Sequence, residues 1–192
     1  MSKLIIGTNN AHKVVEIKAI LGAHYDEILS LEEAGIDLDV LEDGDTFEAN
    51  AIKKAREASL LTNCDTLADD SGLCVDALGG VPGIFSARYA GQDADYRDNN
   101  AKLICEMKGI LDRSAKFVCV MALVHSGEVI TTRGETLGSI TEDLRVGGGF
   151  GYDPIFWSNE LRKTFGQASA DEKNKVSHRY RALAALKEKL EL

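Results

Sequence analysis

The hydrophobic positions at the start of the chain follow two kinds of pattern. A continuous apolar run predicts a buried strand over 3–8. Apolar residues then recur at helical spacing up to Leu21, so Asn9 or Asn10 is expected to cap a helix. A weaker strand is predicted over 26–31. The first part of the chain is therefore expected to contribute both strands and helices.

A second helix is predicted over 45–61, because Asp45 and Glu48 have the spacing of a capping box. Residues 66–75 are apolar at both ends and polar in the middle, which suits either a strand that ends in charge or a polar turn between two strands. Helical periodicity returns over 95–111.

The clearest strand is predicted over 116–125, and an alternating segment over 128–137 is expected to pair with it as a hairpin. A brief strand near 154–157 and a final helix close the pattern. Strands and helices mix without strict alternation, so the sequence predicts the α/β class with a mixed sheet.

Composition narrows the class of protein. The length of 192 residues suits one domain over 1–192. The net charge of −9, from 31 acidic and 22 basic residues, argues against binding of duplex nucleic acid. No apolar run is long enough for a signal peptide or a bilayer span. The four cysteines form no C-x-x-C pair, so we expect a reduced, cytoplasmic protein without structural zinc.

The segment from Thr8 to Lys13 lies at the predicted strand-to-helix junction. Backbone N–H groups and the positive end of the helix dipole attract anions there, and Lys13 adds a charge suited to a triphosphate. The segment lacks the glycines of a Walker loop. An ordinary helix cap followed by a surface lysine is the alternative interpretation.

Two acidic segments are candidates for metal binding. Glu42 lies in a loop with several carboxylates, whose hard oxygens suit Mg²⁺, although a solvated acidic turn explains most of them. Asp69 and Asp70 follow an apolar run, where burial normally excludes unpaired charge. Because neighbouring strand residues point to opposite faces, only one of the pair is expected to face a site squarely. That carboxylate is suited to bind Mg²⁺ and to orient or deprotonate water.

Two later segments are candidates for base recognition. The glycines around Phe150 permit unusual backbone angles, and the ring is suited to stack on a base. Near the C-terminus, Lys173, His178 and Arg179 are expected to converge if Ser177 caps the final helix and Lys173 lies in the preceding loop. A solvated charged face is the alternative for this second segment.

Several motifs, taken in order, carry a resemblance that spans nearly the whole chain. They are Thr8-x-Asn10-x-x-Lys13, Thr46-Phe47…Asn50-Ala51…Lys54-Ala55, Ala68-Asp69-Asp70-Ser71-Gly72-Leu73, Pro82-Gly83…Ser86-Ala87-Arg88-Tyr89, Gly148-Gly149-Phe150-Gly151-Tyr152-Asp153-Pro154 and Ser177-His178-Arg179. In this order they resemble the inosine/xanthosine triphosphate pyrophosphatase family, whose members remove non-standard purine nucleotides from the pool.

The resemblance implies a fold, a reaction and partners. The fold would be elongated and two-lobed, with a long curved mixed sheet flanked by helices and an active-site cleft between the lobes. The reaction would be Mg²⁺-dependent hydrolysis of ITP, dITP or XTP to the monophosphate and pyrophosphate. The protein would be a homodimer, with no nucleic-acid or membrane partner.

The resemblance also implies roles for individual residues. Those that would hold the triphosphate and the rest of the substrate near it are Thr8, Asn9, Asn10, Ala11, His12, Lys13, Lys54 and Ser71. Glu42 and Asp70 would bind Mg²⁺, with Asp70 as proton acceptor and Asp69 supporting it. The base would contact Phe150, Gly151, Tyr152 and Asp153, and its keto edge would accept from Lys173, His178 and Arg179.

One position departs from the family pattern. The family has Thr-Phe-x-Glu-Asn, whereas this chain has Ala49 where that glutamate is expected and Glu48 one position earlier. On a helix this turns the carboxylate by about 100°. We therefore expect an altered affinity for Mg²⁺ if that carboxylate helps to arrange metal or phosphate.

Three other functions fit parts of the pattern. A pyrophosphatase for modified pyrimidine or methylated nucleotides would share the acidic site, but the cationic donors near the C-terminus favour a keto-purine. A nucleotide-binding sensor without turnover would not need Asp69 and Asp70 beside a triphosphate. A nucleic-acid-binding module is disfavoured by the net charge.

Overall fold

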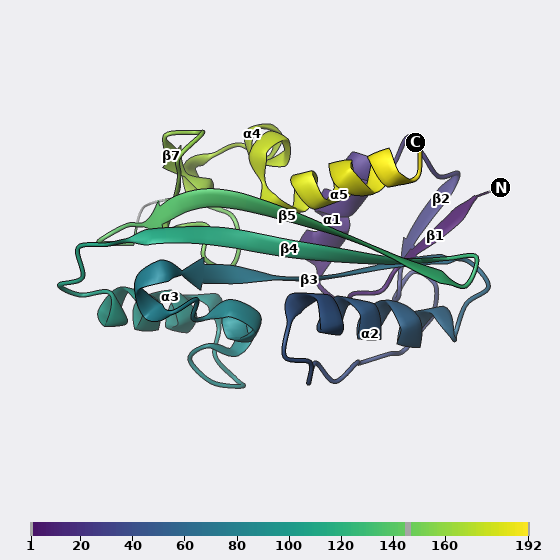
Figure 1. The fold of residues 1–192 in the computed structure, drawn as a ribbon, viewed down its shortest axis with the longest axis horizontal. Coiled ribbons are helices and arrows are strands. Elements are labelled where there is room, and N and C mark those ends of the chain that lie inside the picture. Colours follow the sequence, from purple (N-terminus) through teal and green to yellow (C-terminus); the bar gives the residue numbers. More distant parts are fainter. Residues whose placement is uncertain (1, 145–146, 192) are drawn as a thin grey trace. The chain divides into compact units, whose positions relative to one another are not determined.

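The computed structural model describes residues 2–144 and 147–191, which form an α/β fold (Figure 1). In this part of the chain, strands form one seven-stranded sheet in the order β2-β1-β3-β4-β5-β6-β7. The strands are β1 (Lys3–Ile6), β2 (Glu27–Ser30), β3 (Asp65–Val75), β4 (Ser114–His125), β5 (Glu128–Ile140), β6 (Phe156–Ser158) and β7 (Lys163–Thr164).

The sheet is mixed, as predicted. Strand β1 pairs in parallel with β2, with Leu4 opposite Ile28, and in parallel with β3. Strand β6 pairs antiparallel with both β5 and β7. The α/β class is therefore confirmed.

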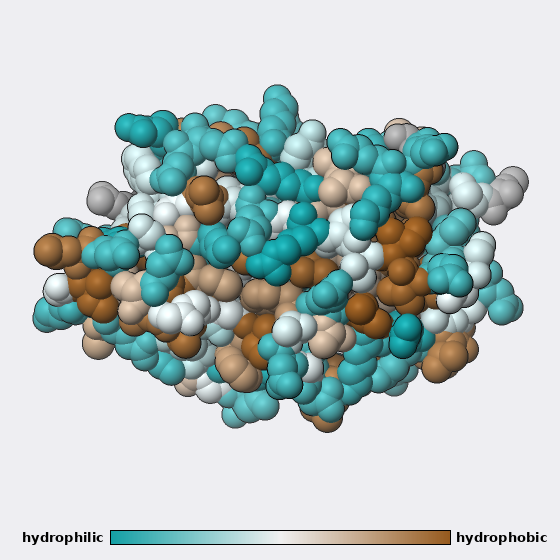
Figure 2. All heavy atoms as spheres, in the orientation of Figure 1, coloured by the Kyte–Doolittle hydropathy of each residue, from teal (hydrophilic) through white to brown (hydrophobic). Residues whose placement is uncertain are grey.

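The helices include the predicted ones and several short turns. They are α1 (Ala11–Leu21), α2 (Phe47–Ser59), α3 (Tyr96–Glu106), α4 (Ala170–Val176) and α5 (His178–Lys189), with 3₁₀ helices η1 (Asp76–Leu78), η2 (Gly83–Arg88) and η3 (Phe165–Gln167). None of the helices in the described residues is long and apolar enough to cross a membrane. The face shown in Figure 2 is largely hydrophilic, with hydrophobic residues in separate patches.

The chain divides into two compact units. Unit 1 comprises Met1–Asp70, Cys119–Gly134 and Arg179–Leu192, and unit 2 comprises Ser71–Val118 and Glu135–His178. The single functional domain over 1–192, the elongated shape and the cleft between lobes stay predictions.

Unit 1 has helices on both faces of its strands (Figure 1). Successive strand residues point to opposite faces. Leu4 and Ile6 accordingly pack in one buried cluster with residues of α1 and α5, whereas Ile5 packs with Ala58 of α2. The continuous apolar run of β1 is therefore explained by burial on both faces, which is typical of parallel strands.

Unit 2 has a core rich in aromatic rings. The rings of Phe117 and Phe156 have centroids 4.6 Å apart and are tilted, and Phe165 lies 5.0 Å from Phe156. Leu103 and Met107 of α3 pack in the same buried cluster. This core fixes the elements from which the predicted base-binding residues project.

Two local predictions about helices were wrong. Helix α2 begins at Phe47 with Thr46 as its N-cap, whose hydroxyl accepts from Ala49 N at 3.1 Å, so Asp45 and Glu48 form no capping box. Lys173 lies in α4 rather than in a loop, because Ser169 caps that helix with Glu172 as its capping-box partner. Ser177 is the C-cap of α4 and directly precedes α5.

Candidate active site

The predicted phosphate-binding segment joins β1 to α1 in unit 1. Asn10 is the N-cap of α1, as expected, and its side-chain oxygen accepts from His12 N at 3.1 Å and Lys13 N at 3.3 Å. The hydroxyl of Thr8 accepts from Asn10 N at 3.2 Å. These bonds fix a short turn at the positive end of the helix dipole, where an anion is favoured.

The same segment borders a cavity of about 680 Å³ within unit 1. Thr8, Asn9 and Ala11 line it, together with residues of α1 and of the chain after β2. Asn9 is anchored by a bond from its side-chain amide to Leu38 O at 3.0 Å. Thr8, Asn9 and Ala11 are therefore accessible from this cavity, while capping bonds hold the start of α1 in place.

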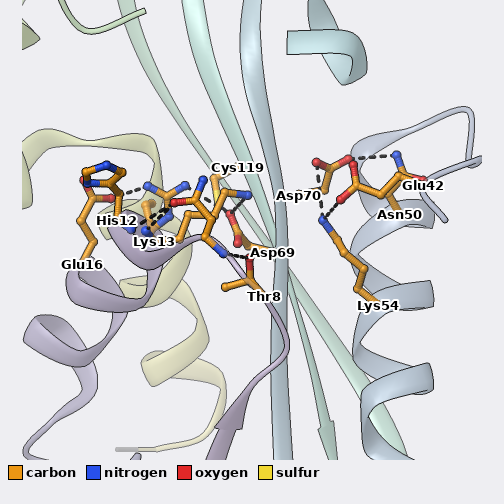
Figure 3. Close-up of polar contacts among 12 residues, drawn as sticks. Thr8, His12, Lys13, Glu16, Glu42, Asn50, Lys54, Asp69, Asp70 and Cys119 are labelled. Carbon is orange, nitrogen blue, oxygen red and sulfur yellow. Dashed lines mark hydrogen bonds and ion pairs between the residues drawn. The ribbon is translucent and has the colours of Figure 1, made fainter. Parts of the chain in front are cut away.

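Asp69 and Asp70 lie inside β3, not at its end and not in a turn. Strand β3 is continuous from Asp65 to Val75, and Asp69 and Asp70 are 0% and 4% exposed. The sequence interpretation missed this because the charges are paired by residues far along the chain. As predicted, the two side chains point to opposite faces of the strand (Figure 3).

Asp69 faces α1 and α5 and belongs to a buried ion-pair cluster (Figure 3). Its Oδ2 atom lies 3.0 Å from Lys13 Nζ and accepts from Arg179 Nη2 at 3.2 Å. Arg179 also pairs with Glu16. Burial alone would raise the pKa of Asp69, but Lys13, Arg179 and Lys54 outweigh it and hold that pKa well below its usual range. Asp69 is therefore ionised and fixed in place.

Asp70 faces α2 and has different surroundings (Figure 3). Asn50 Nδ2 donates to Asp70 Oδ2 at 3.0 Å, and Lys54 Nζ lies 3.8 Å from Asp70 Oδ1 and 2.5 Å from Glu42 Oε1. Burial raises the pKa of Asp70, and Glu42 adds to this rise, against the lowering effects of Lys54, Lys13 and Asn50. A carboxylate with a raised pKa is a better proton acceptor than an ordinary aspartate.

The residues around Lys54 suit a divalent cation. Within the described ranges, no group of three or more His, Cys, Asp or Glu is placed to hold a metal ion. Mg²⁺ in nucleotide enzymes, however, keeps several waters and uses one or two carboxylates together with substrate phosphates. Glu42 and Asp70, which converge on the same ammonium, provide such a pair of oxygen donors.

Lys54 stays charged at this place although it is largely buried. Burial would lower the pKa of its ammonium, but Asp70, Asp69 and Glu42 together raise it. The lysine thus offsets the negative charge of Glu42 and Asp70. A lysine ammonium is a compact charge on a flexible stem, which suits it to pair with a phosphate.

Glu48 and Ala49, where the chain departs from the family pattern, lie near the start of α2. Glu48 is exposed, and its Oε1 atom accepts from Thr131 Oγ1 at 2.8 Å. A Cβ on Gly44 would lie 2.9 Å from the Cβ of Ala49. The loop that carries Glu42 therefore packs closely on α2 at Ala49, whose side chain is small.

In unit 2, the glycine-rich loop is held by Asp153. This side chain accepts from Phe150 N at 3.0 Å and pairs with Lys173 Nζ at 2.7 Å. Gly149 has a φ of +83°, and a Cβ there would lie 2.4 Å from Asp153 Oδ2. The positive φ agrees with the unusual backbone angles expected of this loop, and the close packing on Asp153 also requires glycine here.

Phe150 is half-buried and has charged and aromatic neighbours in unit 2. Lys173 Nζ lies over its ring, 4.4 Å from the centroid, and Tyr96 lies 6.3 Å away in a tilted arrangement. Asn100 Nδ2 donates to Gly151 O at 2.9 Å, which ties α3 to the same loop. The ring and one predicted donor, Lys173, are therefore neighbours.

The remaining predicted residues divide between the units. His178 stacks on Phe117, with centroids 4.7 Å apart, and Tyr152 is buried with its hydroxyl donating to Ser86 O at 2.9 Å. Ser71 is half-buried in β3. Arg179 belongs to unit 1, where it pairs with carboxylates, so its contribution to base binding stays a prediction.

Two residues at these clusters had no predicted role. Asn50 bonds to Asp70, and Glu16 pairs with Arg179 across 163 positions of sequence. Asn50 was noted only as a motif position, and its spacing from Asp70 gave no signal of contact. Glu16 has the pattern of an ordinary polar position in an amphipathic helix, and no signal in the sequence distinguishes it.

Comparisons with known proteins agree with the motifs. The sequence matches the Ham1 family over residues 4–189. It is 51% identical over 199 residues to a protein named dITP/XTP pyrophosphatase from Clostridium perfringens, covering 99% of this chain and 98% of that one. A protein of the same name from Clostridium tetani is 46% identical over 196 residues, covering 99% and 96%. The solved Ham1 protein of Staphylococcus aureus has a TM-score of 0.88 at 40% identity, covering 99% and 98%.

Proposed function

Because this chain belongs to the Ham1 family, we propose that it hydrolyses ITP, dITP and XTP to the monophosphate and pyrophosphate with Mg²⁺. This activity would cleanse the nucleotide pool of non-standard purines. The observation that carries the proposal is Asp70, a buried carboxylate that converges with Glu42 on the Lys54 ammonium. A protein that only bound nucleotide would gain nothing from such a group next to a triphosphate.

The triphosphate would be held by the junction of β1 and α1, by Lys54 and by Ser71. Thr8 to Lys13 lie at the start of α1, where the helix dipole favours an anion, and Lys13 and Lys54 provide positive charge. Ser71 adds a hydroxyl from β3. Glu42 and Asp70 would hold Mg²⁺, which when bound neutralises phosphate charge and polarises the phosphorus for attack. Lys54 would then exchange its carboxylate partners for phosphate oxygens.

Asp70 would accept the proton of the attacking water, and attack at the α-phosphorus would release pyrophosphate. The bond from Asn50 Nδ2 fixes one carboxylate oxygen so that the other can face the water. Asp69 would support the site from the other face of β3 by holding Lys13 in place.

The base would be recognised by residues of unit 2. Phe150 offers a ring for stacking, and Gly151, Tyr152 and Asp153 would complete the pocket wall. Lys173 and His178, with Arg179 from unit 1, would donate to the keto oxygen at position 6. Adenine carries an amino donor at that position, so it would leave these donors unpaired, which disfavours its binding.

The wider setting follows from the same proposal. We infer a cytoplasmic homodimer that acts on small nucleotides and uses neither nucleic acid nor membrane as a partner. The net charge of −9 supports the exclusion of nucleic acid.

Product analysis tests the position of bond cleavage. ³¹P NMR of a reaction with ITP and Mg²⁺ is expected to show IMP and pyrophosphate as the initial products, and a chelator should stop their formation. Appearance of IDP and orthophosphate would place cleavage at the terminal phosphate and would refute the proposed reaction.

A further inference from the structure

Asn50 is a fully buried amide whose two ends are both used. It is 0% exposed and lies in the first turn of α2. Its Nδ2 atom donates to Asp70 Oδ2 at 3.0 Å, and its Oδ1 atom accepts from Gly44 N at 2.8 Å. One side chain thus connects β3 to the loop that precedes α2, and Figure 3 shows its bond to Asp70.

The loop end of this connection is tightly packed. A Cβ on Gly44 would lie 2.7 Å from Asn50 Oδ1 and 2.9 Å from the Cβ of Ala49, so only glycine fits without a shift. Glu42 is two residues away in the same loop. The bond to Asn50 therefore sets the position of the segment that carries Glu42.

Lys54 makes the second connection between the same carboxylates. It lies four residues after Asn50, one turn along the same face of α2. Its ammonium contacts Glu42 and Asp70 directly. If Lys54 turns to a phosphate when nucleotide binds, its contacts with Glu42 and Asp70 are lost. Of the two connections, the one through Asn50 then still holds Asp70 and the Glu42 loop together.

We propose that Asn50 is a positioning residue that sets the spacing of Glu42 and Asp70 for a divalent cation. This inference rests on the proposed function, in which those two carboxylates hold the metal. A neutral amide suits the task because it donates to one segment and accepts from the other without adding charge. Groups that orient metal ligands in this way typically affect metal affinity or activity by about 10- to 100-fold.

The test compares Asn50→Ser and Gly44→Ala, which break the connection at either end. Titration calorimetry of Mn²⁺ into the nucleotide-free protein is expected to show a Kd raised by about 10- to 100-fold in both variants. The apparent Mg²⁺ constant for ITP turnover should rise in parallel. At saturating Mg²⁺, the KM for ITP should stay within about threefold of the wild type, since the phosphate- and base-binding residues are untouched.

Asn99→Ser is the matched control. Asn99 is also a buried helical amide with both ends used, donating to Ala87 O at 3.1 Å and accepting from Ala90 N at 2.7 Å, but it belongs to unit 2. Its replacement should lower the melting temperature and leave the Mn²⁺ Kd within about twofold, because it shares no partner with Asp70.

Several outcomes would overturn the inference. An unchanged Mn²⁺ Kd in Asn50→Ser would do so, as would an equal loss in Asn99→Ser or absence of Mn²⁺ binding by the wild type. If Asn50→Ser does not fold, Gly44→Ala decides the matter by the same measurement. A wild type that hydrolyses no nucleotide, while the variants still lose Mn²⁺ affinity, would refute the proposed function and support the role of Asn50.

Discussion

Asp70→Asn is expected to lower kcat for ITP by about 10²–10⁴-fold, the usual contribution of a positioned general base. Asparagine has nearly the same shape but cannot accept the proton of the attacking water. It would also weaken the metal site, so the loss should lie at the upper end of this range. Binding of ITP should survive, because the change removes a negative charge beside a triphosphate. Steady-state kinetics and a direct binding measurement with the inactive variant check both parts.

Asp65→Asn is the control for this prediction. Asp65 lies on the same strand and also has a polar partner, with its carboxylate 2.9 Å from His125 Nδ1. Its replacement should leave kcat within about twofold, because surface charge pairs away from the chemistry contribute little. If Asp70→Asn kept a wild-type kcat, Asp70 would not be the proton acceptor. If Asp70→Asn abolished nucleotide binding, Asp70 would be needed for binding the nucleotide and not for the proton transfer.

Asp69→Asn is expected to lower the free energy of unfolding, in addition to any effect on the reaction. Asp69 is fully buried, and its Oδ2 atom contacts both Lys13 and Arg179, which is 1% exposed. Removal of one partner from a buried ion pair leaves an uncompensated charge and typically costs about 3–5 kcal/mol. Denaturant unfolding should show this loss in the free energy of unfolding. A loss close to zero would mean that Glu16 alone compensates Arg179.

The low pKa of Asp69 gives this contribution a pH dependence. The unfolded chain takes up a proton near the ordinary aspartate pKa of about 3.9, whereas the folded protein takes it up at lower pH. The stabilisation is therefore fully present above that value and is lost as pH falls toward the folded pKa. Unfolding curves of wild type and Asp69→Asn should converge at strongly acidic pH. Glu33→Gln, which breaks the exposed pair with Lys18, should change stability very little at any of these pH values.

Local patterns predicted most of the fold. The buried run of β1, the Asn10 cap and the helical spacing of α1 depend on residues close in sequence, and all were found. The N-cap of α2 was misplaced by one residue, because Thr46 and Asp45 are both good caps and only tertiary packing decides between them. Strand β3 was the harder case, since its central charges are tolerated only because α1, α2 and α5 supply their partners.

The sequence indicated which residues belong to the candidate site better than it indicated which of them contact one another. The alternation of a strand was enough to predict that Asp69 and Asp70 face different ways. Nothing local indicated that Arg179 would pair with Glu16 and Asp69, because these contacts join positions far apart in sequence. The same is true of Asn50, whose bond to Asp70 depends on how α2 packs against β3.

The substrate preference of the purified protein with Mg²⁺ tests the proposed function most directly. Pyrophosphate release should be measured as kcat/KM for dITP, XTP and ITP against ATP. We expect a preference for the keto-purines of at least about 10²-fold, since an amino group at position 6 leaves buried donors unpaired. Equal turnover of ATP, or no pyrophosphate from any of the four nucleotides, would contradict the proposed function.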